Sequence, residues 1–102
     1  MKYMFYPLER LSNLHDGYQR AFSVAGKPLL LVQNKGRCQV LINQCPHQQA
    51  SLVNATLDED CLRCPIHGMR FDLTTGRSPD GCTQSLQFIS IAYEGNQLGV
   101  DL

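Results

Sequence analysis

The pairing of cysteine with histidine in two short segments constrains this chain more than any other feature. One residue separates Cys45 from His47, and two residues separate Cys64 from His67. The chain holds only three histidines, so these two pairs use all but one of them. Thiolates and imidazoles are the side chains that bind soft or borderline transition metals. Two loops that meet at their tips would bring two sulfurs and two nitrogens to one metal site.

Three interpretations of this pattern compete. The residues could be ordinary core and surface side chains, although two matched pairs make that a weak reading. They could form a structural zinc site, because Cys61 and Cys64 have the spacing of a zinc-binding pair. A strand over 60–64 would, however, point Cys61 and Cys64 to opposite faces. The third interpretation is a [2Fe–2S] cluster in which two histidines replace two cysteines on one iron, and the spacing favours it.

Composition narrows the class of protein. Nine basic and nine acidic side chains cancel, so no basic face for nucleic acid is expected. The N-terminal segment has no apolar stretch of signal-peptide length, and no run is long enough to span a membrane. We therefore expect a cytoplasmic protein, where reducing conditions disfavour disulfides. Five cysteines, an odd number, also cannot all pair with one another.

Strand signals dominate the rest of the chain. Alternating or continuous apolar runs separated by Gly, Asn and Pro predict strands over 18–24, 29–33, 38–43, 85–93 and 97–102. Only residues 8–14 could form a helical turn. The two segments that fit a strand least, 44–53 and 64–76, carry the cysteine–histidine pairs and are predicted to be loops. We expect one all-β domain over residues 1–102, a small sandwich or barrel of antiparallel sheets.

The stretches CPHQQASL and CPIHGMRFDLTTG resemble the two cluster-binding boxes of Rieske proteins, in particular the small Rieske-type ferredoxins. A proline-bearing turn over 78–81 follows, as in that family. The resemblance implies a small antiparallel β-sandwich of stacked sheets with two cluster-binding hairpin loops, at about 44–53 and 64–76. It also implies one [2Fe–2S] cluster, with Cys45 and Cys64 on the inner iron and His47 and His67 on the outer iron.

Several positions depart from the Rieske proteins of respiratory and photosynthetic complexes. Those proteins carry a disulfide at the positions of Ala50 and Ile66, and hydroxyl donors at the positions of Met69 and Phe71. Donors to sulfur stabilise the reduced cluster, so their absence predicts a potential nearer about −150 mV than +300 mV. The second iron site of an oxygenase needs two further histidines and a carboxylate, and only one histidine, His15, remains.

The resemblance implies an electron carrier rather than an enzyme. It would take one electron from a reductase, expected to be flavin-dependent, and pass it to an oxygenase or similar redox enzyme, docking near His47 and His67. The alternatives are a fixed small subunit of a larger reductase, like those of nitrite reductases, and a zinc-stapled interaction domain. We expect Cys38 to fill core space, Cys82 to be a buried or half-exposed thiol, and Cys61 to be an alternative ligand at most.

Overall fold

The computed structural model describes residues 4–46, 50–66 and 68–102, and within them the fold is almost entirely β. The central sheet has the order β2-β3-β4-β8, with bounds Gln19–Val24, Lys27–Asn34, Arg37–Ile42 and Phe88–Ile89. A second sheet has the order β1-β10-β9, with bounds Phe5–Arg10, Gln97–Asp101 and Ile91–Glu94. The third has the order β5-β6-β7, with bounds Thr56–Asp58, Cys61–Arg63 and Arg70–Asp72. All these pairings are antiparallel, which confirms the predicted fold class.

Strand β3 separates two hydrophobic cores because its successive side chains point to opposite faces. Leu30 and Val32 pack into the core that also contains both buried cysteines, Cys45 and Cys64. Leu29, one position before Leu30, points to the opposite face of the sheet and packs into the other core, beneath β1 and β10. A strand buried on both faces reads as a continuous apolar run, and residues 29–32 are such a run. The central sheet is therefore the layer on which the other two sheets are stacked.

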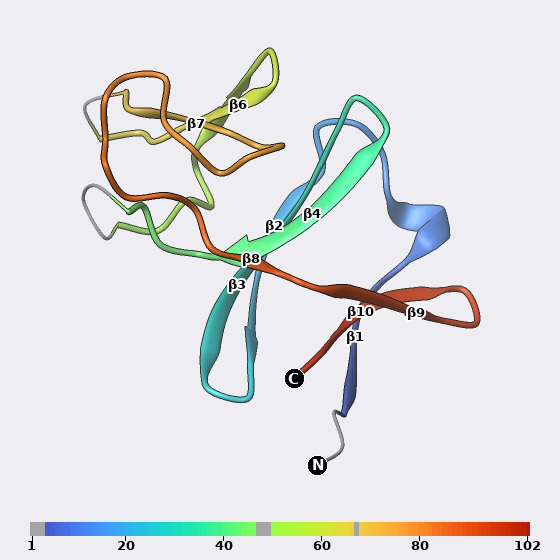
Figure 1. Cartoon of the computed structure of the whole chain (residues 1–102). Coiled ribbons are helices and arrows are strands. Elements are labelled where there is room, and N and C mark those ends of the chain that lie inside the picture. Colours follow the sequence, from blue (N-terminus) through green and yellow to red (C-terminus); the bar gives the residue numbers. More distant parts are fainter. Residues whose placement is uncertain (1–3, 47–49, 67) are drawn as a thin grey trace.

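The small sheet β5-β6-β7 lies at one end of the molecule, away from both chain termini (Figure 1). The segments that lead into the two predicted loops reach the same end. Cys45 follows β4 and Cys64 follows β6, so each cysteine sits where a strand ends. The fold thus brings the two cysteine-bearing segments together from different sheets.

The predicted strands over 18–24, 29–33, 38–43 and 97–102 are confirmed within a few residues at each end. The continuous strand predicted over 85–93 is wrong. It is divided into β8 and β9, because the chain pairs with β4 before Ser90 and with β10 after it. An apolar run reports burial, but it does not say that the strand changes sheets.

Two further expectations need correction. The helical turn expected over 8–14 is a short 3-10 turn, Leu11–Asn13, because the residues up to Arg10 pair with β10. The second predicted loop, 64–76, contains β7, whose Phe71 pairs with Leu62 of β6. Three residues of strand between Gly68 and Gly76 are too short to show a period of two. No helix of the described part is long and apolar enough to cross a membrane.

Candidate metal centre

The two cysteine-bearing loops are closed by the same kind of hydrogen bond. The backbone N–H of Cys45 donates to the carbonyl of Ala50 at 2.7 Å, and that of Cys64 donates to the carbonyl of Met69 at 2.8 Å. In each case the acceptor lies five residues after the cysteine. This backbone bond fixes the base of each loop, so each cysteine leaves its strand in a defined direction.

Cys45 and Cys64 are both fully buried, and their side chains meet. Burial raises the pKa of the Cys64 thiol; the backbone N–H of Ile66 donates to its sulfur and lowers the pKa, whereas a hydrogen bond with the Cys45 side chain raises it. Two free thiols in contact, from different sheets, form the sulfur half of the predicted site. This donor pair fits a cluster that takes two of its ligands from cysteine.

The other two predicted ligands, His47 and His67, lie outside the described residues, and their assignment stays a prediction. The described residues beside them are less covered than the cysteines. Pro46 is half-buried, Pro65 is exposed, and Ile66 is 40% exposed. The chain therefore rises from buried sulfur to surface within one or two residues on both loops.

Of the other three cysteines, two lie outside the core that holds this pair and one packs against it. Cys61 is half-buried on β6, where it pairs with Asp72 of β7, and it does not belong to the core that holds Cys45 and Cys64. Cys38 packs on the opposite core, and its thiol donates to Gln33 Oε1 at 3.3 Å. Cys82 is half-buried against the core of the cysteine pair. Within 4–46, 50–66 and 68–102, no three His, Cys, Asp or Glu side chains gather as metal ligands would.

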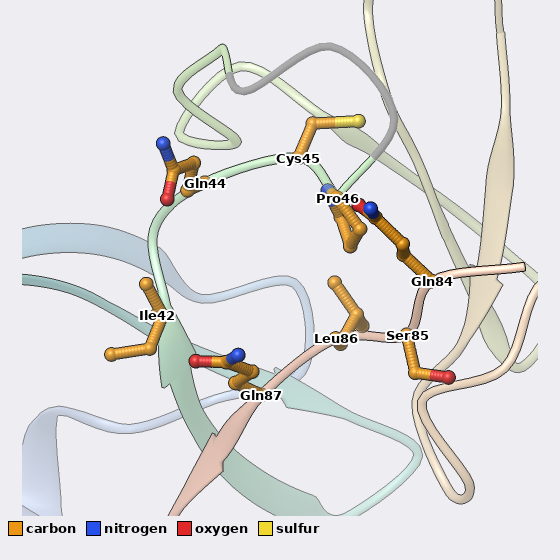
Figure 2. Close-up of a pocket in the computed structure, with 8 residues that line it drawn as sticks. All are labelled: Ile42, Gln44, Cys45, Pro46, Gln84, Ser85, Leu86 and Gln87. Carbon is orange, nitrogen blue, oxygen red and sulfur yellow. The ribbon is translucent and has the colours of Figure 1, made fainter.

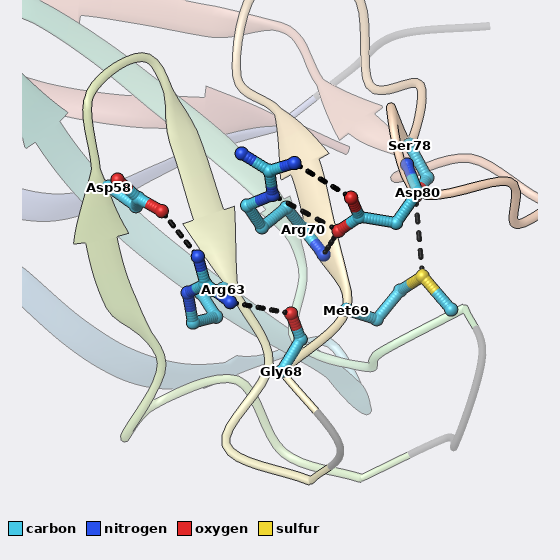
Figure 3. A network of polar contacts seen from close by, with 7 residues as sticks. All are labelled: Asp58, Arg63, Gly68, Met69, Arg70, Ser78 and Asp80. Atoms are coloured by element: carbon cyan, nitrogen blue, oxygen red, sulfur yellow. Dashed lines mark hydrogen bonds and ion pairs between the residues drawn. The ribbon is translucent and has the colours of Figure 1, made fainter.

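The proline-bearing turn over 78–81 packs on the second loop through contacts that the sequence does not predict (Figure 3). Arg70 donates to both oxygens of Asp80, at 3.1 and 2.8 Å, and its backbone N–H also donates to Asp80 at 2.9 Å. These Arg70 contacts lower the pKa of the Asp80 carboxyl to about 2. The Ser78 hydroxyl donates to the sulfur of Met69 at 3.4 Å. Opposite charges ten positions apart carry no local signal, so only the fold could reveal this pairing.

A cleft of about 550 Å³ lies beside Cys45, between the first loop and the segment that follows the proline-bearing turn (Figure 2). Among the residues that the structure describes, no charged side chain lines it. Its walls combine amide and hydroxyl groups with apolar carbon, from Ile42, Gln44, Cys45, Pro46, Gln84, Ser85, Leu86 and Gln87. The cleft shows that solvent reaches close to the first loop even though the Cys45 side chain is covered.

Buried paired thiols on two matched loops, in an all-β fold, agree with one family of proteins. The chain matches the Rieske [2Fe-2S] domain over residues 4–87. The chain belongs to the Rieske [2Fe–2S] domain family. The resemblance found in the sequence is thereby confirmed, and a Rieske domain implies a [2Fe–2S] cluster.

Several relatives of this Rieske domain are ferredoxins. The chain is 33% identical over 89 residues to the ferredoxin component of the alkene monooxygenase system of Xanthobacter autotrophicus, covering 86% of this chain and 73% of that one. It is 30% identical over 93 residues to the ferredoxin component of the naphthalene 1,2-dioxygenase system of Pseudomonas aeruginosa, covering 90% and 89%. It also matches apoptosis-inducing factor 3 of mouse and human at 34% identity, but there it spans only 12% of the relative's length.

Solved structures support the fold. The ferredoxin of Sphingomonas yanoikuyae B1 superposes with a TM-score of 0.84 at 24% identity, over 97% of this chain and 99% of that one. A chain from the complex of reduced oxygenase and oxidized ferredoxin in carbazole 1,9a-dioxygenase gives a TM-score of 0.80 at 26% identity, over 91% and 97%. A structure described as a nitrite reductase small subunit has the same fold, with a TM-score of 0.76 at 14% identity.

Proposed function

We propose that this protein is a one-electron carrier that holds one [2Fe–2S] cluster through Cys45, His47, Cys64 and His67. The observation that carries the proposal is the contact between two fully buried thiols, Cys45 and Cys64, on loops that are closed in the same way. In the sequence, one of the two histidines follows each of these cysteines after one or two residues: His47 after Cys45, and His67 after Cys64. When bound, such a cluster supplies a reversible one-electron redox centre. The protein itself catalyses no covalent change of a substrate.

The residues around the sulfurs support a potential toward the low end of the Rieske range. Phe71 is fully buried in the core with both cysteines and carries no hydroxyl. The Met69 side chain is a thioether with no proton to donate, and its sulfur instead accepts a hydrogen bond from Ser78. Fewer donors to sulfur leave the more negative, reduced state less stabilised. The backbone N–H of Ile66 remains as a donor to Cys64.

We propose a reductase, expected to be flavin-dependent, as the electron donor and an oxygenase or similar redox enzyme as the acceptor. The support is the set of relatives that are ferredoxin components of oxygenase systems. Docking would take place around His47 and His67, where Ile66 and Pro65 expose apolar surface. Small exposed apolar patches suit short-lived encounters between redox proteins. We also propose a cytoplasmic location, since five cysteines cannot all pair as disulfides and reducing conditions keep thiols available as metal ligands.

Metal and sulfide analysis of the purified protein tests the cluster. We expect a brown protein with about two irons and about two acid-labile sulfides per chain, bleached by dithionite. A colourless protein with about one zinc per chain would support the zinc-stapled domain and overturn the proposal.

Ligand exchange tests the assignment of the histidines. His47→Cys and His67→Cys should each lower the reduction potential or lose the cluster, because a thiolate is more negative than an imidazole. His15→Cys is the matched control, since His15 lies in an exposed turn outside both loops. Spectra of the first two variants that match the wild type would contradict the assignment. Co-purification in a stable stoichiometric complex would favour a fixed reductase subunit over a free carrier.

A further inference from the structure

Arg63 connects the small sheet to the second cluster-binding loop. It is the last residue of β6 and directly precedes Cys64. Its backbone already pairs with Thr56 of β5, and Cys61 pairs with Asp58, so the strand pairing does not depend on the side chain. The side chain is 41% exposed, which means that more than half of its surface is covered by neighbouring groups.

The guanidinium group bridges two groups on either side of it (Figure 3). Nη1 donates to the carbonyl of Gly68 at 3.1 Å, and Nη2 donates to Asp58 Oδ2 at 2.5 Å. Gly68 has a φ of +69°, and a Cβ at that position would lie 3.2 Å from Nη1. The guanidinium therefore lies directly over Gly68. Together with the bond from Cys64 to Met69, it holds two successive carbonyls of the returning loop.

The first loop shows that closing such a loop does not require a charge. There the side-chain amide oxygen of Asn43 accepts the backbone N–H of Leu52 at 2.7 Å, beside the bond from Cys45 to Ala50. Asn43 is neutral, whereas Arg63 carries a positive charge that Asp58 opposes from the side away from the loop. Since reduction adds one negative charge near Cys64, a positive charge on this loop favours the reduced state.

We propose that Arg63 is a positioning residue for the cluster. It fixes the backbone that follows the second ligand pair, and its positive charge raises the reduction potential, an effect that the negative charge of Asp58 opposes. The inference rests on the proposed function, because it requires a cluster at Cys64 and His67. In the redox step the cluster takes one electron from an external reductant, and no covalent bond forms or breaks. Arg63 and Asp58 keep their charges throughout.

Redox titration of the cluster-loaded protein tests the inference. Arg63→Met should make the cluster about threefold harder to reduce, which corresponds to about 28 mV at 59 mV per tenfold for one electron. Asp58→Asn should shift the potential upward by a similar factor, because its amide oxygen can still accept from Arg63 while the opposing charge is gone. Arg63→Lys keeps the positive charge, so its reduction potential should stay closer to that of the wild type. A lysine cannot bridge Asp58 and the Gly68 carbonyl as the guanidinium does, so this variant should lose its cluster faster than the wild type.

Lys27→Met is the matched control, because it removes one positive charge from an exposed residue at the turn between β2 and β3. Its potential should not move. Shifts of Arg63→Met and Asp58→Asn in the same direction, or no shift in either, would overturn the electrostatic role. If Arg63→Met does not retain a cluster, Asp58→Asn decides: an upward shift supports the inference, and an unchanged or lower potential refutes it. A wild-type protein without iron and sulfide overturns the proposed function itself, whereas a loaded wild type with unresponsive variants overturns this inference alone.

Discussion

Substitution of Gly76 by alanine should destabilise the protein far more than the same substitution in an open turn. Gly76 is buried at the end of the turn that follows β7, with a φ of +82°. An added Cβ would lie 3.0 Å from the carbonyl oxygen of Leu86 and 3.1 Å from the ring of Phe88. The Leu86 N–H donates to the carbonyl of Gly76 at 2.9 Å, so Leu86 cannot retreat without weakening that bond.

The magnitude has two parts. The left-handed backbone costs an alanine about 1–2 kcal/mol, and crowding in a packed region adds about 1–3 kcal/mol. Gly26→Ala is the matched control, because Gly26 has a φ of +79° and nothing within 4 Å of the added Cβ. The two variants therefore share the first cost and differ in the second. For a domain of this size, that difference should lower the unfolding temperature of Gly76→Ala by on the order of 10 °C more than that of Gly26→Ala.

The assay is thermal unfolding of the loaded protein by circular dichroism at one fixed scan rate, because cluster loss makes unfolding irreversible. Visible absorbance recorded in parallel follows the cluster. We expect Gly76→Ala to bleach at a lower temperature than Gly26→Ala, since Leu86 packs in the core that contains Cys45. Equal unfolding temperatures for the two variants would refute the reasoning, because crowding at Gly76 would then cost nothing.

Three other predictions concern the surroundings of the site. Phe71→Tyr places a hydroxyl in the core that holds both cysteines, and it should raise the reduction potential by stabilising the reduced state; an unchanged or lower potential in a redox titration would count against it. Bonds from Arg70 lower the pKa of Asp80 from 3.8 to about 2, so the stabilisation from this pair is present above pH 3.8 and lost as the pH falls toward 2. Asp80→Asn should therefore lose β structure less steeply over that interval in circular dichroism, and an identical acid profile would contradict the assignment. Ile66→Ala removes exposed apolar area at the proposed docking face and should raise the KM for an acceptor oxygenase by roughly fivefold at unchanged potential. The oxygenase of a naphthalene 1,2-dioxygenase system serves as the acceptor, and an unchanged KM would place the docking face elsewhere.

Much of the site was predictable because its information is local. Each box is defined by two residues that lie close together in the sequence: Cys45 and His47 with one residue between them, and Cys64 and His67 with two. The apolar run over 29–32 likewise predicts a buried strand, because burial of β3 on both faces requires apolar side chains at every position. Residue types and their spacing are enough for such features.

The tertiary structure alone decided which groups meet across the chain. It divides the run over 85–93 between two sheets, places β7 inside the second predicted loop, and pairs Arg70 with Asp80 and Arg63 with both Asp58 and Gly68. The first depends on which sheet each strand joins, and the others depend on how β5, β6 and β7 pair and on how the turn over 78–81 folds back against β7. A local pattern reports whether a position is buried or exposed, but not which distant group it faces. The four candidate ligands, and the expectation that the two sulfurs share one site, can therefore be named from the sequence, whereas the charged groups that hold the second loop follow only from the fold.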